Sequence, residues 1–185
     1  MTLIPLAGRI MCYLLSEPRR TASGIYIADK IKEFPRRGRV LAVGGSWARK
    51  DGTRWEPFCE VDDVVHFRRA REQNMGGGIV GIWFEDVIAI EPAGTKEIKA
   101  PENYLIIDVS YRETLQGSTI IIPDAFKKQN ADYWGVVLDI GPKFKHKQVK
   151  AGDKIIFPRD EGFPIQVNGK NLVSLRERWV VGILD

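Results

Sequence analysis

The sequence predicts an all-β protein that contains two tandem small β-barrels joined by a short linker. Short runs rich in valine and isoleucine recur along the chain, and glycine, proline and Asp-Gly turns separate them. No long stretch has a persuasive helical period. The apolar runs also occur twice in the same order, which is the pattern of a duplicated domain.

Four apolar runs of the first half are predicted strands. Each has the length of an ordinary strand, and they cover residues 9–14, 39–43, 64–67 and 87–90. Glycines stand beside several of the runs, as at Gly38 and Gly44, and glycine suits the tight bends at the corners of a small barrel.

The second half repeats this order. The first-half segments at residues 24–29, 38–44, 63–67 and 87–90 correspond to the second-half segments at residues 119–124, 135–141, 153–157 and 180–183. By subtraction, the offsets are 95, 97, 90 and 93 residues, and loop insertions produce a drift of this size. Four matches in one order indicate a tandem duplication.

The join between the halves is expected at residues 91–101. This stretch holds two prolines, a glycine and several charges, as a short interdomain linker should. We therefore expect a first domain at residues 1–92 and a second at residues 101–185.

The composition is that of a soluble globular protein. The chain has 185 residues, of which 44% are hydrophobic and 28% are charged. No apolar run approaches the ~18 residues of a membrane span, and the N-terminus lacks the pattern of a signal peptide. The net charge of +4 mildly favours acidic partners.

The residue patterns of a metal site or a catalytic site are absent from the sequence. Cys12 and Cys59 form no CxxC pair, and His66 and His146 lie far apart. We expect two free thiols, while the sequence leaves a disulfide open. There is no GxSxG or HExxH motif, and no GxGxxG motif follows a predicted strand, as a Rossmann domain requires. The sequence thus predicts a protein with no metal, no cofactor and no enzymatic activity.

Five segments of the first half form an ordered series of motifs at residues 5–10, 21–27, 38–44, 61–67 and 85–91. The series resembles the GroES family, the small co-chaperonins that cap chaperonin rings. The second half is a looser match that keeps an apolar triplet followed by Pro123, the segment VKAGDKIIF and a hairpin segment at residues 167–173. The resemblance covers nearly the whole chain and implies two GroES-like barrels, similar to the double-domain co-chaperonins of chloroplasts.

The resemblance also implies a docking segment, because the family's mobile loop binds the chaperonin through an apolar tripeptide. The matching residues are Gly24, Ile25, Tyr26 and Ile27 in the first half and Ile120, Ile121 and Ile122 in the second. Ser118 and Thr119 stand where the family usually has glycines. On pattern alone, the two triplets would instead be ordinary core strands.

A hairpin is predicted at residues 45–57, around the Asp51-Gly52 turn. Trp47 and Trp55 flank this turn and are candidates for a cross-strand aromatic pair. The segment aligns with the family's roof hairpin, which closes the top of the dome; the alternative is that the two tryptophans simply stabilise a hairpin. The equivalent segment of the second half, residues 142–148, is much shorter, so we expect little or no roof there.

The partners implied by the resemblance are a GroEL-type chaperonin, with ATP or ADP bound to that partner, further copies of the chain in a homo-oligomeric ring, and unfolded client proteins. Family members pair terminal strands between neighbouring barrels. The candidates are residues 10–15, 87–90, 105–109 and 180–183. The family's rings are sevenfold, which two domains per chain do not divide. The expected location is the cytoplasm, an organelle stroma or matrix, or the host cytoplasm for a viral protein.

Two other functions stay open on the sequence. A GroES-fold structural or assembly protein, for example a viral one, would keep the fold and no longer bind a chaperonin. Basic residues cluster near residues 36–39, 68–71 and 143–150, and an oligonucleotide-binding barrel is conceivable. A solvated strand edge or loop explains these charges more simply, so nucleic acid is not the favoured partner.

Overall fold

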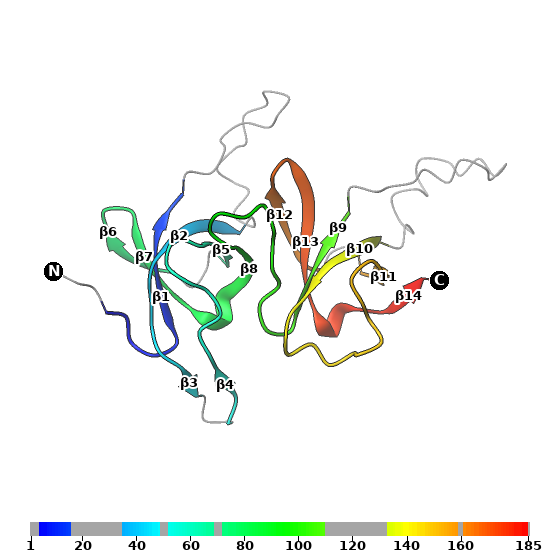
Figure 1. Cartoon of the computed structure of the whole chain (residues 1–185), viewed down its shortest axis with the longest axis horizontal. Helices are drawn as coiled ribbons and strands as arrows, with labels where there is room; N and C mark the ends of the chain where they lie inside the picture. The colour runs from blue at the N-terminus through cyan, green and yellow to red at the C-terminus, as the bar shows by residue number, and fades with distance from the viewer. Residues whose placement is uncertain are drawn as a thin grey trace. The chain divides into compact units, whose positions relative to one another are not determined.

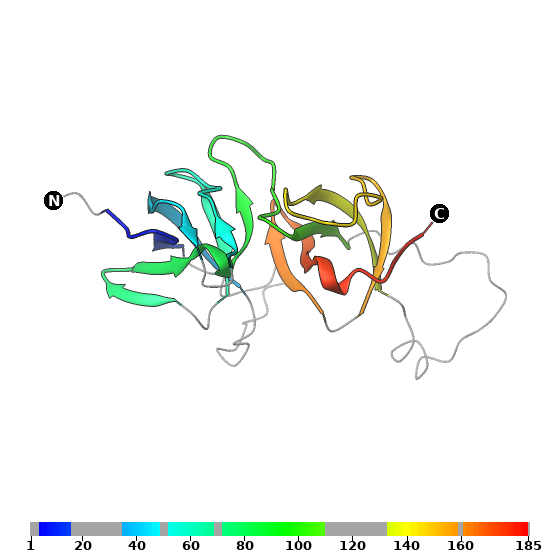
Figure 2. The same cartoon turned by 90° about the horizontal axis from the view of Figure 1, so that it is seen from below.

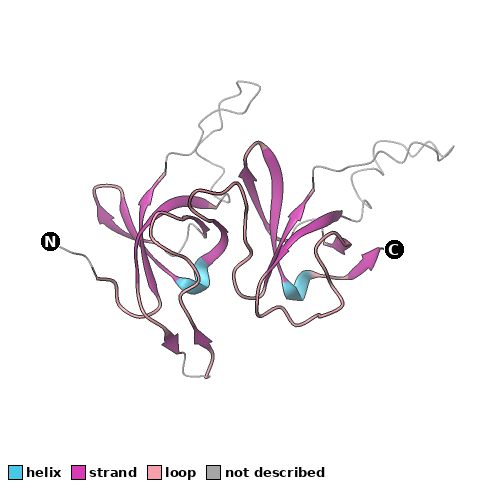
Figure 3. Cartoon of the chain, viewed as in Figure 1, coloured by secondary structure: helices cyan, strands magenta, loops and turns pink. Residues whose placement is uncertain are grey.

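A computed structural model describes residues 4–15, 35–48, 52–68, 72–109, 133–158 and 161–184. The chain divides into two compact units, Met1–Pro101 (unit 1) and Glu102–Asp185 (unit 2). Regular structure in the described residues is β-strand apart from two short 3-10 helices (Figure 3). The all-β prediction is therefore confirmed. No helix in the described part of the chain has the length and hydropathy of a transmembrane span.

Unit 1 contains a six-stranded sheet with the order β6-β7-β1-β2-β5-β8, in which all neighbours are antiparallel. Its strands are β1 (Arg9–Leu14), β2 (Arg36–Val43), β5 (Val64–Phe67), β6 (Gln73–Gly76), β7 (Ile79–Trp83) and β8 (Val87–Glu91). A separate two-stranded hairpin consists of β3 (Trp47–Ala48) and β4 (Arg54–Trp55).

Unit 2 contains a second six-stranded antiparallel sheet, with the order β12-β13-β9-β10-β11-β14. Its strands are β9 (Tyr104–Asp108), β10 (Tyr133–Ile140), β11 (Lys154–Phe157), β12 (Phe163–Val167), β13 (Lys170–Arg176) and β14 (Gly182–Leu184). Apart from the β3–β4 hairpin, the two units have the same strand order (Figure 1). The topology thus repeats as the sequence does.

The two sheets share a β-bulge at the same position. In unit 1, the register of β1 against β2 shifts so that Leu41 has no opposite residue, and in unit 2 the register of β9 against β10 shifts at Leu138. Both leucines are more than a third exposed. A bulge bends a strand and increases its twist, so each sheet curves at this point.

Each unit has a hydrophobic core of its own. In unit 1, the side chains that point inward come from all strands of the sheet except β6, and Ile10, Phe67 and Ile82 are fully buried. In unit 2, Leu105, Ile155 and Leu175 are fully buried in the equivalent way. Full burial of one such side chain contributes about 1.5–3 kcal/mol, so these residues are the main source of stability in each unit.

The strands of each unit curve around its core in both views (Figures 1 and 2). Among the described residues, no strand pairing joins β6 to β8 or β12 to β14. Each unit is therefore a curved six-stranded sheet, and closure into the predicted barrel by strand pairing is not detected.

Candidate functional site

The first apolar triplet lies in the connection between β1 and β2. These strands are neighbours: Leu14 is opposite Gly38, and the backbone N–H of Leu15 donates to the carbonyl of Arg37 at 3.0 Å. Residues 16–34, which include Gly24, Ile25, Tyr26 and Ile27, lie outside the described residues. The structure therefore places the two ends of this connection side by side and leaves the docking role a prediction.

The second triplet lies in the equivalent connection of unit 2, between β9 and β10. These strands are also neighbours, with Asp108 opposite Val136. Residues 110–132, which include Ile120, Ile121 and Ile122, lie outside the described residues. Both triplets thus belong to the connection between the first two long strands of their unit.

A close-packed glycine follows each connection. A Cβ atom on Gly38 would lie 2.7 Å from the Cβ of Cys12 and 3.2 Å from the ring of Phe67. A Cβ atom on Gly135 would lie 2.4 Å from the Cγ2 of Ile107 and 2.8 Å from the carbonyl oxygen of Asp108. The three distances below 3.0 Å are closer than real Cβ contacts, so only glycine fits at either position without a shift. At Gly38, β2 therefore lies tightly against β1, and at Gly135, β10 lies tightly against β9.

A polar cluster centred on the buried His66 lies across β2, β5 and β8 in unit 1. His66, only 2% exposed, donates from Nε2 to Oε1 of Glu91 at 2.7 Å, and Arg37 donates to the same oxygen at 2.8 Å. Burial lowers the pKa of His66, and Glu91 raises it only in part, so the pKa lies below its ordinary value. Burial tends to raise the pKa of Glu91, but His66 and Arg37 together lower it. The cluster therefore holds a neutral imidazole beside a charged carboxylate.

The same positions in unit 2 carry an apolar surface. Trp134 is opposite Ile156, and Lys154 is opposite Leu184. Trp134, Ile156 and Leu184 stand where unit 1 has Arg37, His66 and Glu91, and Lys154 stands where unit 1 has Val64. The ammonium of Lys154 lies 5.2 Å from the centre of the Trp134 ring. The second repeat thus keeps the strand pairing of this face and has apolar side chains where the first repeat has a polar cluster.

The predicted hairpin forms strands β3 and β4, in which Trp47 is directly opposite Trp55. Trp47 also packs on Trp83, with ring centroids 5.2 Å apart, while Trp55 faces Phe58 at 6.4 Å. A Cβ on Gly8 would lie 2.7 Å from the Cβ of Trp47, so Trp47 lies directly on that glycine.

The turn of the hairpin contains Gly52, whose φ of +83° requires a glycine-like conformation, and Asp51, which lies outside the described residues. Figure 1 places the hairpin at the end of unit 1 opposite to the end of β1. Its role as a roof stays a prediction. In unit 2, the connection between β10 and β11 contains no strand.

The terminal strands of the two sheets differ in exposure. In β8, Val87, Ile88, Ala89 and Ile90 are buried, and Lys99 from the following segment forms an antiparallel bridge with Ile90. In β14, Ile183 and Leu184 are each 38% exposed, and Val181 just before it is 69% exposed. The outer edge of β14 has no strand paired to it within the described residues.

The remaining candidate groups are placed as follows. Cys12 and Cys59 are free and buried, and burial raises the pKa of each thiol to about 12. In the described residues, no group of three metal-ligating side chains comes together. Of the first basic clusters, Arg36 pairs with Glu72 and Arg68 pairs with Asp86.

Comparison with known proteins gives one family. The sequence model of the family described as "Chaperonin 10 Kd subunit" (Cpn10) matches residues 2–80 and again residues 97–184. Among curated relatives, the co-chaperonin GroES of Natranaerobius thermophilus is 38% identical over 69 residues, which cover 37% of this chain and 73% of the relative. The GroES of Geobacillus kaustophilus is 40% identical over 65 residues, 35% of this chain and 70% of the relative. The GroES of Geobacter sulfurreducens is 40% identical over 67 residues, 36% of this chain and 70% of the relative.

Proposed function

This chain belongs to the Cpn10 family of co-chaperonins, in a tandem form, and from that premise we propose that it caps a GroEL-type chaperonin ring in the ring's nucleotide-bound state and encloses a folding substrate. The predicted family is confirmed, and membership agrees with a non-enzymatic role. ATP or ADP would be bound by the partner and not by this chain.

The observation that carries the proposal is the position of the two triplets. Both family matches include a triplet, and in both units the triplet lies between two adjacent antiparallel strands. A connection of this kind begins and ends at one place, so it can present its middle residues to a partner without disturbing the sheet. Both copies are therefore candidate docking segments.

The energetics favour many weak contacts over one strong contact. Burying three large apolar side chains yields about 1.5–3 kcal/mol for each. Ordering the segment costs about 1–2 kcal/mol per backbone residue, which cancels much of that gain. The net affinity of one segment is then modest, and several segments on one ring bind together through their high effective concentration.

A ring requires contacts between chains. The edge of β8 is covered and the edge of β14 is open in the described residues, and this difference supports a specific contact between chains. In unit 1, the segment that carries Lys99 pairs with the edge of β8. By the internal repeat, the equivalent segment near the N-terminus includes Ile4 and Leu6, which are 82% and 78% exposed. We propose that this segment of one chain covers the open edge of β14 in the next chain. Rings built in this way contain an even number of domains, so their match to a sevenfold partner requires asymmetry, unused domains or a double layer.

The test is to mix the whole chain with the chaperonin of its own host and ATP, and to look for a capped complex and slowed ATP turnover. The variant Ile25→Ser/Ile27→Ser should lower the apparent affinity at least about tenfold, since two buried apolar side chains are lost from every copy. The variant Ile120→Ser/Ile122→Ser shows whether the second segment also docks.

A matched control is Val61→Ser, which removes an apolar side chain that is 55% exposed and lies before β5. It should leave capping unchanged. Absence of any complex would overturn the capping role and favour the structural or assembly protein that the sequence left open. A complex that is indifferent to all four isoleucine changes would overturn the assignment of the docking segments.

A further inference from the structure

An exposed apolar patch lies at the end of unit 1 where β1 ends, and no role assigned so far uses it. It consists of Tyr13 on β1, Met75 on β6 and Ile79 on β7. Tyr13 is 50% exposed, Met75 is 61% exposed and Ile79 is partly exposed. The three strands are consecutive in the sheet, and Tyr13 is directly opposite Ile79. Exposed apolar side chains that gather in this way are typical of an interaction surface.

The turn between β6 and β7 holds the patch in place. Gly76, Gly77 and Gly78 have φ angles of +86°, +60° and +79°, which other residues rarely adopt. A Cβ atom on Gly78 would lie 3.1 Å from the ring of Tyr13, so this ring lies directly on the glycine. The N–H of Leu14 donates to the carbonyl of Gly78 at 2.8 Å. The sheet and its turn therefore position the apolar side chains.

The patch lies beside the first docking connection. The N–H of Leu14 binds the β6–β7 turn, and the N–H of the next residue, Leu15, binds Arg37 at the other end of the connection. Figure 1 shows the end of β1 and the β6–β7 turn at one end of unit 1, and the β3–β4 hairpin at the opposite end. A partner that binds the connection therefore approaches the end of unit 1 that carries the patch.

Unit 2 has different side chains at the equivalent place. Asp108 is opposite Leu172 there, as Tyr13 is opposite Ile79 in unit 1. The carboxylate of Asp108 lies 4.0 Å from the ammonium of Lys170, and Leu172 is only 3% exposed. Unit 2 thus has an ion pair where unit 1 has exposed apolar side chains.

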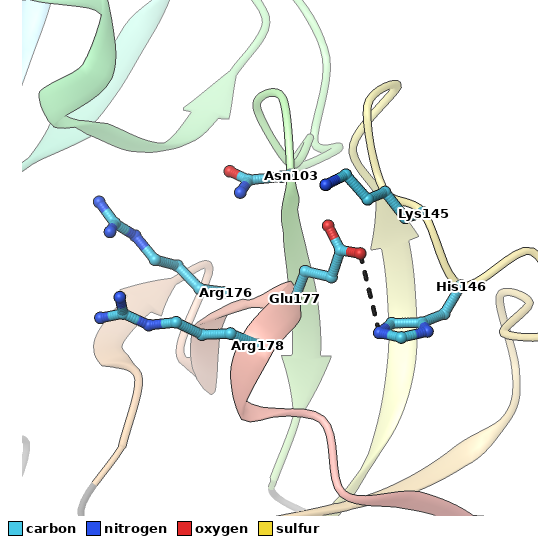
Figure 4. Close-up of a pocket in the computed structure, with 6 residues that line it drawn as sticks. All are labelled: Asn103, Lys145, His146, Arg176, Glu177 and Arg178. Atoms are coloured by element: carbon cyan, nitrogen blue, oxygen red, sulfur yellow. Dashed lines mark ion pairs between the residues drawn. The ribbon is translucent and has the colours of Figure 1, made fainter.

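The other end of unit 2 has a basic hollow of about 380 Å³ where the hairpin packs on unit 1, because the 3-10 helix beside it hydrogen-bonds to the start of the first strand in both units. Figure 4 shows both of its arginines pointing away from Lys145, His146 and Glu177. Their guanidinium groups lie 5.3 and 4.9 Å from the ring centres of Tyr104 and Trp179. The cations do not converge on one ligand, so the apolar patch of unit 1 is the stronger candidate. The residues that line the hollow are Asn103, Lys145, His146, Arg176, Glu177 and Arg178.

We propose that the patch binds the margin of the same chaperonin surface that receives the first triplet, an inference that rests on the proposed capping role. A surface that buries an apolar triplet is itself apolar, so contact with further apolar side chains at its margin is favourable. Methionine suits such a contact, because its unbranched side chain adapts to different surfaces. Ile25 is ten residues beyond Leu15, which limits the distance between the triplet and the patch to about 35 Å.

Methionine oxidation tests this contact in the unmodified chain. Hydrogen peroxide transfers one oxygen atom to the thioether, which becomes a sulfoxide, and the peroxide leaves as water. In the free chain, Met75 should oxidise much faster than Met11, which is 6% exposed. In the capped complex, with ATP and the chaperonin of its own host, oxidation of Met75 should slow at least about fivefold when followed by peptide mass spectrometry.

The outcomes separate this contact from capping itself. An equal rate at Met75 in the free and the capped chain would overturn the contact and leave the capping role intact. Protection that appears without chaperonin, as the chain concentration rises, would assign the patch to a contact between copies of the chain and would also overturn the proposal. If no capped complex forms, the capping role fails and this inference fails with it.

Two substitutions at Met75 separate binding from folding. Met75→Ser should weaken capping at least about threefold, because an apolar side chain is lost from every copy, while Met75→Leu should cap as the parent does. The matched control is Val61→Ser, since Val61 is 55% exposed and lies outside the patch. Equal capping by the serine and leucine variants at position 75 would contradict the proposed contact.

Discussion

Units 1 and 2 share one strand order and one bulge position, yet they differ in several groups of side chains outside their cores. Unit 1 has a His66–Glu91–Arg37 cluster in which His66 is buried, and a hairpin anchored by tryptophans. Unit 2 has an apolar face at the positions equivalent to the His66 cluster, and a basic hollow at the positions equivalent to the tryptophans of the hairpin. The core positions that specify the fold have been kept, and the outward positions have diverged.

One pair of positions shows how this divergence keeps an interaction while exchanging its partners. In unit 1, Arg9 of β1 stacks on Trp83 of β7, which is directly opposite it. In unit 2, the aromatic residue is Tyr104 on β9 and the cation is Arg176 on β13, again directly opposite. A cation–π contact of this type contributes about 0.5–1 kcal/mol at an exposed site, whichever strand carries the cation.

The two units can be followed separately through their thiols. Cys12 and Cys59 are both in unit 1, both are buried, and both have pKa values of about 12, so neither reacts while unit 1 is folded. A chain with Cys12→Ala, Cys59→Ala and Val137→Cys carries its one thiol in the core of unit 2. A short pulse of thiol reagent at fixed pH then reports the unfolding of one unit at each denaturant concentration.

The largest predicted effect concerns the residue three positions after the glycine that follows β2 in unit 1 and β10 in unit 2, which is Trp47 or Phe144. Phe144 of unit 2 is 3% exposed and belongs to the core, whereas Trp47 of unit 1 is half-buried on the outside. We expect Phe144→Ala to destabilise unit 2 by about 3–5 kcal/mol, because it leaves a cavity. Pulse labelling at Val137→Cys measures this loss. A change below about 1 kcal/mol would show that Phe144 is not a core residue.

A smaller effect is expected at the close-packed glycines. Gly135→Ala should destabilise unit 2 by about 1–3 kcal/mol, because its Cβ would meet Ile107 and the backbone of Asp108. Gly45→Ala is the matched control, since no atom lies within 4 Å of its Cβ, and it should be neutral or slightly stabilising. Denaturant midpoints of the two variants should therefore move in different directions or by clearly different amounts.

Much of this fold follows from local sequence patterns. The strand at Arg9–Leu14 was predicted to the residue, and the Asp-Gly turn correctly placed Trp47 opposite Trp55. β6 was not predicted as a strand, because its residues are polar and exposed. Local alternation and turn residues carry the information that the successful predictions used.

The contacts that define the candidate sites are non-local, and the sequence did not indicate them. Trp83 meets Trp47 across 36 residues of chain only because β7 and the hairpin lie at one end of the sheet. His66 meets Glu91 only because β5 and β8 are neighbours in the sheet order. Without that order, a lone histidine in an apolar run has no identifiable partner.

A third prediction tests whether the hairpin of unit 1 is an appendage of the sheet. Trp47→Ala removes one aromatic contact worth about 0.5–1.5 kcal/mol beyond the area that it buries. Thiol pulse labelling of the native cysteines should therefore show a small loss of stability in unit 1 and none in unit 2. A loss as large as that expected for Phe144→Ala would make Trp47 a core residue and remove the contrast between the units.

The smallest effect is a pH dependence that only unit 1 should have. His66 has a folded pKa below its ordinary value of 6.5, so the unfolded chain binds a proton first as the pH falls. The contribution of His66 to stability is thus fully present above about pH 6.5 and is lost as the pH falls from there toward the folded pKa. Glu91, whose folded pKa is also lowered, adds a loss in the same direction below its ordinary pKa of 4.5.

This dependence is measured by equilibrating the chain in denaturant at pH 7.5, 6.5 and 5.5 and then pulsing with thiol reagent at one common pH. The denaturant midpoint of unit 1 should be lower at pH 5.5 than at pH 6.5. In the variant His66→Gln, this midpoint should depend less on pH. Unit 2 has Ile156 at the equivalent position, so its midpoint should not follow. A parallel fall in both units would place the titrating group outside the cluster, and the exchange of His66 for Ile156 would then have no consequence for stability.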